Sequence, residues 1–238
     1  MAERNSSSYE MIPDRPRPIA LAIVELPVLY ARALFAPVAR MYEAEGKRAG
    51  WGIVWVQLVI LIVVPGALGL LRGLHRSATV TNITSSQALY NAIASIAVGT
   101  SVVATLIQVL VVPVIFFIGV GVQYLAAKAF KGAALFVEQA YTTLLYAVPL
   151  AIVSGIISTL LVFFVHLSLR IVVVPVITLA LFIYGILLNI VAIEGVHRLT
   201  RPRATTAVLL PYIIAVLLAC GLTFYLAHFI ISAVHNIH

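Results

Sequence analysis

Residues that could do chemistry are few in this chain, and they are poorly placed for catalysis. Of the eight acidic residues, only Glu138 and Glu194 lie after residue 46, in the long apolar part of the sequence. Glu194 and His197 are the acid and the histidine that an enzyme hypothesis would have to use. The chain has no nucleophile–base pair, phosphate-binding loop or HExxH-type motif. The sequence therefore predicts a protein that is not an enzyme and that needs no cofactor.

Metal-ligating patterns are weak as well. His235 and His238 share a helix face at i,i+3, but no Cys, Asp or Glu lies nearby, so a polar C-terminal tail is the better interpretation. The single cysteine, Cys220, lies inside an apolar run and provides neither a disulfide nor a ligand set. We expect no metal site.

The middles of the long apolar segments contain no charged residue. Proton-coupled transporters need ionisable groups there, because protons move between such groups. The mid-block polar residues are instead Gln57, Gln108 and Asn189, with scattered Ser and Thr. Such residues usually form interhelical hydrogen bonds of modest strength. This pattern argues against a pump or a proton-coupled transporter.

The overall composition is that of a membrane protein. Apolar residues make up 63% of the chain and charged residues 10%, whereas ordinary soluble domains have about 45–50% and about 25%. The net charge of +7 comes from cations in loops and at the N-terminus. These cations are not interleaved with aromatic residues as a nucleic-acid groove requires, so no nucleic-acid partner is expected. The lipid bilayer is the expected partner.

Five apolar blocks are long enough to cross a hydrocarbon layer of about 30 Å, which takes about 20 helical residues. We place the spans at about residues 52–71, 98–122, 144–165, 167–193 and 207–234. The predicted fold class is all-α: a polytopic helical membrane bundle over residues 49–238, with an N-terminal interfacial segment.

The residues before the first span differ in character. Residues 1–18 are polar and proline-rich, and we expect a disordered cytoplasmic tail. Residues 19–48 mix apolar and charged residues, which suits an amphipathic segment in the membrane interface, broken at Pro37. The apolar stretch 19–31 is too short to span. A cleaved signal peptide is the alternative interpretation of this stretch, and Glu25 in its middle argues against it.

The distribution of cations predicts the orientation. With five spans, twelve Lys and Arg lie on the N-terminal side of the membrane and three on the other side. Cytoplasmic loops carry the excess of Lys and Arg, so the N-terminus is expected in the cytoplasm and the C-terminus outside. We expect the protein in a cell membrane.

Each predicted span contains one proline. We expect Pro149 and Pro211 in or near the first turn of their helices, where the missing N–H costs little. Pro65 and Pro113 lie deep enough to kink their helices and to free backbone carbonyls. Kinks can serve gating, but prolines are commonly tolerated in membrane helices, so structural roles are favoured.

Small residues at four-residue spacing indicate close helix packing, because they let helix backbones approach each other. Bundle packing within the chain is the favoured interpretation, and a homo-oligomer face is the alternative. These residues are Ser95, Gly99, Ser101 and Thr105 in the second span, Ser154 and Ser158 in the third, and Gly69 and Gly73 at the end of the first.

Two stretches carry a more specific pattern. The first is a loop with Lys131-Gly132, followed by Ala140-Tyr141 and Pro149 at the start of the third span. The second begins after the fourth span with Glu194-x-x-His197 and continues to Arg203 and Pro211. Over about residues 30–234 the chain resembles the YIP domain family of Ypt/Rab-interacting, five-span membrane proteins. The positions that carry the resemblance are Gly132, Tyr141, Pro149, Glu194, His197, Arg203 and Pro211.

This resemblance implies a cytoplasmic N-terminus and an outside C-terminus, as the cations do. Eukaryotic members have a long N-terminal region and an Asp-Leu-Tyr-Gly-Pro motif, where this chain has a short tail and Leu34-Phe35-Ala36-Pro37. The chain looks like the compact prokaryotic members, which places it in a prokaryotic cytoplasmic membrane. Rab binding and Golgi trafficking are therefore not implied.

The leading hypothesis is a non-enzymatic membrane scaffold or accessory subunit. It would act through helix packing with other membrane proteins or lipids, because packing signals are present and chemistry is absent. The alternative is a channel or transporter for a small neutral or hydrophobic solute, using kinks at Pro65 and Pro113.

Overall fold

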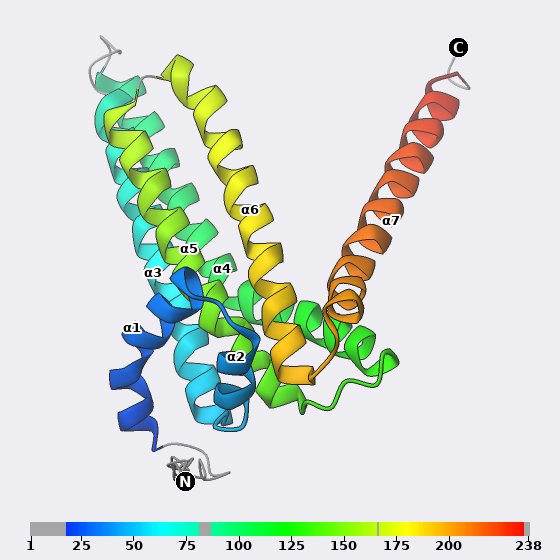
Figure 1. Ribbon diagram of the computed structural model, residues 1–238. Helices are drawn as coiled ribbons and strands as arrows, with labels where there is room; N and C mark the ends of the chain where they lie inside the picture. Colours follow the sequence, from blue (N-terminus) through cyan, green and yellow to red (C-terminus); the bar gives the residue numbers. More distant parts are fainter. Residues whose placement is uncertain (1–17, 81–86, 166, 236–238) are drawn as a thin grey trace, which may run out of the picture.

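The computed structural model describes residues 18–80, 87–165 and 167–235. These residues form seven helices and no strand (Figure 1). The expected tail over residues 1–18 lies outside the described residues, apart from Pro18. The helices are α1 (Ile19–Phe35), α2 (Ala39–Gly46), α3 (Trp51–Val80), α4 (Gln87–Ala129), α5 (Phe136–Phe164), α6 (Leu167–His197) and α7 (Arg201–His235).

Five helices in the described residues are long and apolar enough to cross a membrane. Their candidate spans are Trp51–His75, Leu106–Ala129, Phe136–Phe164, Val172–His197 and Arg201–Tyr225. The all-α class and the five spans predicted from the sequence are thus confirmed.

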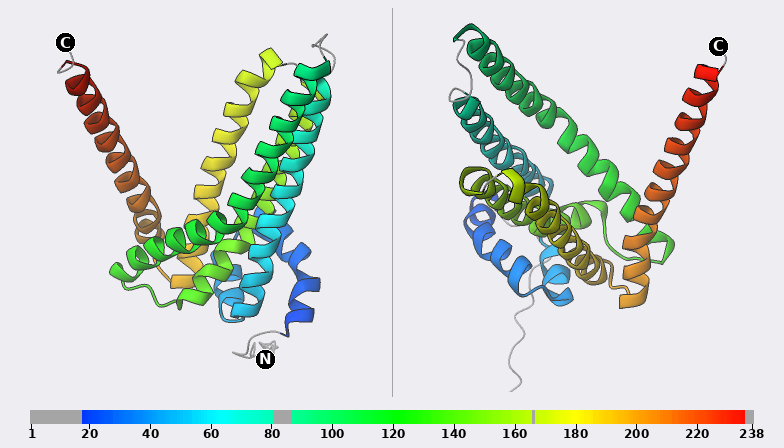
Figure 2. Two further views of the ribbon diagram at one scale, coloured as in Figure 1. Left: turned by 180° about the vertical axis from the view of Figure 1, so that it is seen from behind. Right: turned by 90° about the horizontal axis from the view of Figure 1, so that it is seen from above.

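Four of the long helices, α3 to α6, form the body of the molecule, and the fifth diverges from it (Figures 1 and 2). Within the body, α3 packs against α4 and α5, and α5 packs against α6. Helix α7 contacts α4 and α6 near its N-terminal end, where Ala204, Ala207 and Val208 are buried. Farther along, α7 leaves the bundle at an angle, so its apolar surface is not covered by the other helices.

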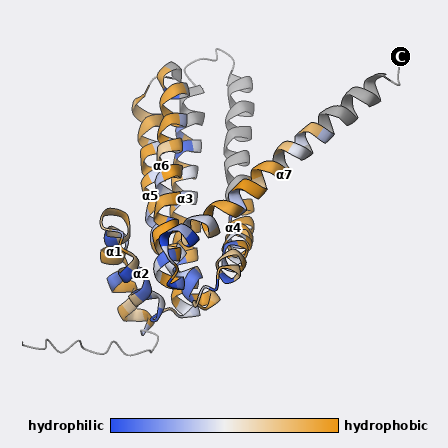
Figure 3. Cartoon of the chain, turned by 45° about the vertical axis from the view of Figure 1, so that its right-hand side comes forward, coloured by the Kyte–Doolittle hydropathy of each residue, from blue (hydrophilic) through white to orange (hydrophobic). Residues whose placement is uncertain are grey.

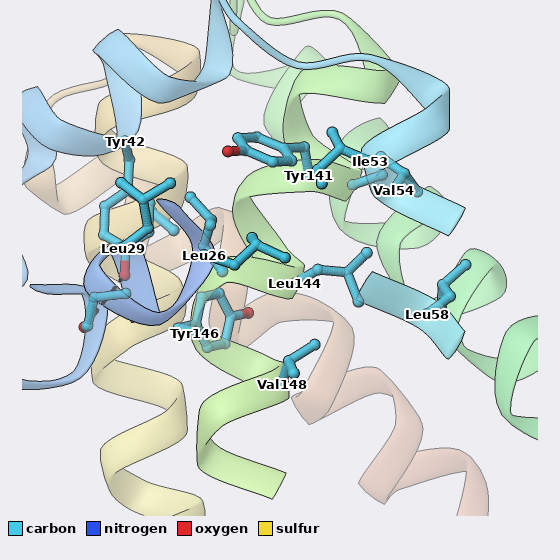
Figure 4. Close-up of a cluster of buried hydrophobic side chains, with 14 of the residues drawn as sticks. Leu26, Leu29, Tyr42, Ile53, Val54, Leu58, Tyr141, Leu144, Tyr146 and Val148 are labelled. Carbon is cyan, nitrogen blue, oxygen red and sulfur yellow. Dashed lines mark hydrogen bonds between the residues drawn. The ribbon is translucent and has the colours of Figure 1, made fainter. Parts of the chain in front are cut away.

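The two short N-terminal helices pack beside one end of the bundle. Hydrophilic residues gather at this end, whereas the coloured parts of the long helices above it are predominantly hydrophobic (Figure 3). Leu26 and Leu29 of α1 join Val54 and Leu58 of α3 and Leu144 of α5 in the main buried cluster (Figure 4). The chain breaks between α1 and α2 over residues 36–38, which include Pro37. We call this end of the molecule the base.

Two helices extend farther toward the base than the apolar pattern suggests. Helix α5 begins at Phe136 and α7 at Arg201, so Pro149 and Pro211 lie in helix interiors. The expectation that both prolines occupy a first turn is therefore wrong, because the polar residues before the apolar blocks are already helical. Helix α4 changes direction in its second half, which contains Pro113 (Figure 2). A kink imposed by Pro113 or Pro65 stays a prediction.

Candidate functional site

The base of the bundle holds a buried histidine near the end of α6. His197 is 1% exposed, and its Nε2 lies 2.7 Å from Oε1 of Gln139 on α5. The side-chain N–H of Gln139 donates to the carbonyl of Val120 on α4 at 3.2 Å. Oε1 of Gln139 is therefore the acceptor, so Nε2 of His197 carries the proton. This chain of hydrogen bonds joins α4, α5 and α6.

A glycine loop closes over the other side of the same histidine. The Gly132 N–H donates to the Ala127 carbonyl at 2.9 Å, and the Ala133 N–H donates to the His197 carbonyl at 3.2 Å. A Cβ added at Gly132 would overlap Nδ1 of His197. The loop can approach this closely only because residue 132 has no side chain. Nδ1 is buried beneath it with no hydrogen-bond partner.

A buried carboxylate links α2 to α5 at the base. Glu45 is 6% exposed, and its Oε2 accepts from the Tyr141 hydroxyl at 3.4 Å. Its Oε1 accepts from Arg48 at 3.4 Å. A buried carboxylate is costly unless it is paired and hydrogen-bonded, and Glu45 has both kinds of partner. The cluster is thus built to hold α2 in place.

Helix α2 also packs very closely on α6. A Cβ added at Gly195 would overlap the carbonyl oxygen of Ala39, at the start of α2. Just beyond the end of α6, Nε of Arg198 lies 3.0 Å from Oε1 of Glu43. The chain turns at Arg198 (φ 53°), and its guanidinium meets α2.

A cavity of about 430 Å³ opens at the base between α2, the loop before α5 and the end of α6. Three of its charged lining residues already interact with other groups of the protein. Arg198 pairs with Glu43, and Glu138 accepts the backbone N–H of Leu135 at 2.8 Å as a cap of α5. Its charged lining residues are Glu43, Glu138, Lys47 and Arg198, two acids and two bases. The lining has no excess of either charge.

A second cavity, of about 420 Å³, lies within the membrane spans between α5, α6 and α7. Its lining is mostly apolar, with the hydroxyls of Tyr146, Ser154, Thr178 and Tyr212 among the lining groups. Such a groove suits a neutral or apolar ligand. The described residues contain no group of three His, Cys, Asp or Glu side chains that could hold a metal ion.

The packing residues proposed from the sequence are dispersed over the bundle. Ser95, Gly99, Ser101 and Thr105 lie outside the residues whose side chains are described. Gly73 is buried and Gly69 half-buried in α3, while Ser154 and Ser158 are half-buried in α5. The tight approach of α3 to α5 lies at Gly155, where an added Cβ would be 2.8 Å from Leu68. A role in partner binding stays a prediction for all of them.

The motif positions are partly brought together. Gly132 and His197 touch, Tyr141 reaches Glu45, and Pro149 is buried in α5. Glu194 and Pro211 are half-buried, and Arg203 is exposed. Gly195 was not singled out from the sequence, although a glycine between Glu194 and Val196 in an apolar helix is itself a signal of close packing.

Comparison with known proteins identifies the family. Residues 31–223 match the family model described as the Yip1 domain, and this range covers most of the chain. No curated protein and no solved structure matches the chain. The matched range contains the glycine loop, the buried histidine and every other motif position described above. The chain therefore belongs to the Yip1 domain family.

Proposed function

We propose that this Yip1 domain protein is a non-enzymatic membrane scaffold or accessory subunit that packs against partner membrane proteins or lipids. The observation that carries the proposal is α7, whose apolar surface is left open by the other helices of the chain. The base supports it, because its polar groups hold helices together and no catalytic arrangement is found among the described residues.

Over residues 213–218, helix α7 is open around its whole circumference. Ile213, Val216, Leu217 and Leu218 are 54%, 60%, 66% and 69% exposed. Successive helical residues differ by about 100° in direction, so these side chains point to different sides. An ordinary helix at the edge of a bundle faces lipid with its outer side and is covered by neighbouring helices on its inner side, the side that faces the bundle. The open inner side of α7 suits a helix from a partner, since helix association in membranes depends on close van der Waals packing.

Orientation and location follow the cation distribution. The excess of Lys and Arg on the N-terminal side supports a cytoplasmic N-terminus and base and an outside C-terminus. The resemblance to the compact prokaryotic members of the family supports a prokaryotic cytoplasmic membrane. The partner would then meet α7 within the bilayer. A second copy of the chain is one form that such a partner can take.

Site-specific photo-crosslinking in native membranes tests this function. A photoreactive residue at Leu217 of α7 should give a discrete crosslinked product, whose mass identifies a partner protein or a second copy. Val63 of α3 is the matched control, since it is 58% exposed on a helix already packed in the bundle. If neither Leu217 nor Val63 gave a crosslinked product, the result would contradict the proposal.

A channel or transporter for a small neutral or hydrophobic solute is the second candidate. The cavity between α5, α6 and α7 supports it, because it combines apolar walls with a few hydroxyl groups. Its test is solute flux into liposomes. Flux that rises with the protein and falls for Ser154→Leu would favour this candidate over the scaffold. Flux unaffected by the protein across a panel of neutral solutes would rule it out.

A further inference from the structure

Helix α1 is apolar on both of its sides. Ala22, Leu26, Leu29, Ala33 and Leu34 are buried against the bundle. On the other side, Leu21, Val24 and Val28 are 51%, 75% and 55% exposed. The charged residues of α1 are Glu25, which is half-buried, and Arg32, which is exposed. A helix with this much apolar surface on both sides belongs in a protein core or in a membrane. Yet the 17 residues of α1 extend only about 25 Å at 1.5 Å per residue, short of the roughly 30 Å needed to span.

The C-terminal end of α1 lies deep in the bundle. The Tyr184 hydroxyl of α6 donates a hydrogen bond to the carbonyl of Leu34. Tyr184 is near the middle of the candidate span Val172–His197. At 1.5 Å per residue it is about 20 Å along the helix from His197. The end of α1 is therefore level with the middle of a membrane span (Figure 1).

The chain then returns to the base. Ala39, at the start of α2, lies against Gly195, close to the end of the α6 span. Gly195 is about 16 Å along α6 from Tyr184. Helix α1 ends at Phe35, and the four residue steps from Phe35 to Ala39 cover about 13–14 Å in an extended chain, most of that distance, at about 3.3–3.6 Å each. Figure 1 shows this connection descending from the top of α1 to α2.

Three backbone carbonyls at the C-terminal end of α1 accept hydrogen bonds from within the protein. The last carbonyls of a helix lack helical partners, and each must find an internal donor in hydrocarbon. Here the Ala36 N–H donates to Arg32 at 2.9 Å, and the Tyr42 hydroxyl donates to Ala33 at 3.5 Å. The Tyr184 hydroxyl donates to the Leu34 carbonyl. At the surface of the protein, water would satisfy these carbonyls without two tyrosines.

We propose that residues 19–46 form a re-entrant hairpin, not a segment that lies flat in the interface. Helix α1 enters the bilayer from the N-terminal side, the chain turns near the midplane over residues 36–38, and α2 brings it back to the base. The partner of its outer side is the acyl chains of that one leaflet. Phe35 and Val38 at the turn, 85% and 56% exposed, are in contact with these chains.

Arg32 is the one cation on this outer side and fits the same arrangement. Helical side chains tilt toward the helix N-terminus, which for α1 is the direction of the base. A long arginine side chain placed below the turn can thus extend its guanidinium toward the headgroups while its methylenes stay among acyl chains. Residues 33–38 contain no charged side chain, so the turn itself places no charge in the hydrocarbon.

Depth measurement by spin labelling tests the hairpin. Replacing Cys220 with serine removes the only cysteine, and single cysteines are then introduced by Phe35→Cys at the turn and Lys47→Cys at the base. Phe182→Cys is the reference near the middle of α6, where Phe182 is 52% exposed. Each protein is labelled in lipid vesicles, and collisions with oxygen and with a water-soluble nickel complex give the depth.

The hairpin predicts that the label at residue 35 lies within a few ångströms of the label at residue 182, roughly 15 Å below the headgroups, or half of a hydrocarbon layer of about 30 Å. The label at residue 47 should be accessible to nickel. A label at residue 35 as shallow as that at residue 47 would overturn the proposal. Val38→Cys reports on the same turn should the Phe35 variant fail to fold. The result does not depend on whether α7 binds a partner.

Discussion

Gly195 sets how closely α2 packs on α6, and its replacement by alanine should force the two helices apart. The added Cβ would overlap the carbonyl oxygen of Ala39 and lie 2.8 Å from its carbonyl carbon. Both atoms belong to backbone, so no flexible side chain can move aside. Overpacking of a well-packed site costs about 1–3 kcal/mol, and a backbone clash should reach the upper part of that range.

Gly121→Ala is the matched control. Gly121 also lies inside a long helix, but an added Cβ there would meet no atom within 4 Å. Both variants gain up to about 1 kcal/mol of helix propensity. Their difference therefore isolates the overpacking cost, about 2–3 kcal/mol by the argument above.

Thermal unfolding in detergent, followed by circular dichroism, measures this difference. Gly195→Ala should unfold several degrees below the parent protein, since about 1 kcal/mol corresponds to roughly 2–4 °C for a chain of this size. Gly121→Ala should unfold at or above the parent temperature. Equal midpoints for the two variants would refute the close contact between α2 and α6.

Three further experiments test the polar contacts of the base and of the turn after α1. A double-mutant cycle with Glu43→Gln and Arg198→Gln should give a coupling of about 0.2–1 kcal/mol that falls with added salt, because the pair is largely exposed. Gln139→Leu should lower the free energy of unfolding by about 1–3 kcal/mol, since it leaves the buried Nε2–H of His197 without an acceptor; an unchanged unfolding midpoint would contradict the network. Tyr184→Phe should cost about 0.6–1.7 kcal/mol and increase proteolysis between α1 and α2, whereas unchanged cleavage would show that this hydroxyl does not hold the turn.

The large features of the fold could be predicted because hydrophobicity determines them locally. Runs of apolar residues give the five spans, and Pro37 marks the break between α1 and α2. The early start of α5 was missed, because Glu138, Gln139, Thr142 and Thr143 resemble a loop by composition. In the structure the polar groups of Glu138, Gln139 and Thr142 are hydrogen-bonded, so a polar sequence forms the first turns of a helix.

The site itself depends on contacts between distant parts of the chain. The sequence indicates that Gly132 and His197 belong to a pattern, but not that the glycine covers the imidazole ring. Arg198 has an acid at i−4 and nevertheless pairs with Glu43, which no local rule indicates. The depth of α1 is likewise invisible in its sequence, because it depends on which residue of α6 meets Leu34.

Accessibility of the two termini in sealed cells tests the five-span architecture most directly. An odd number of spans must place the termini on opposite sides of the membrane. We predict that an epitope fused to the C-terminus is reached by antibody or protease from outside intact cells, and that one fused to the N-terminus is reached only after the membrane is opened. Two termini accessible from the same side would contradict the five-span bundle.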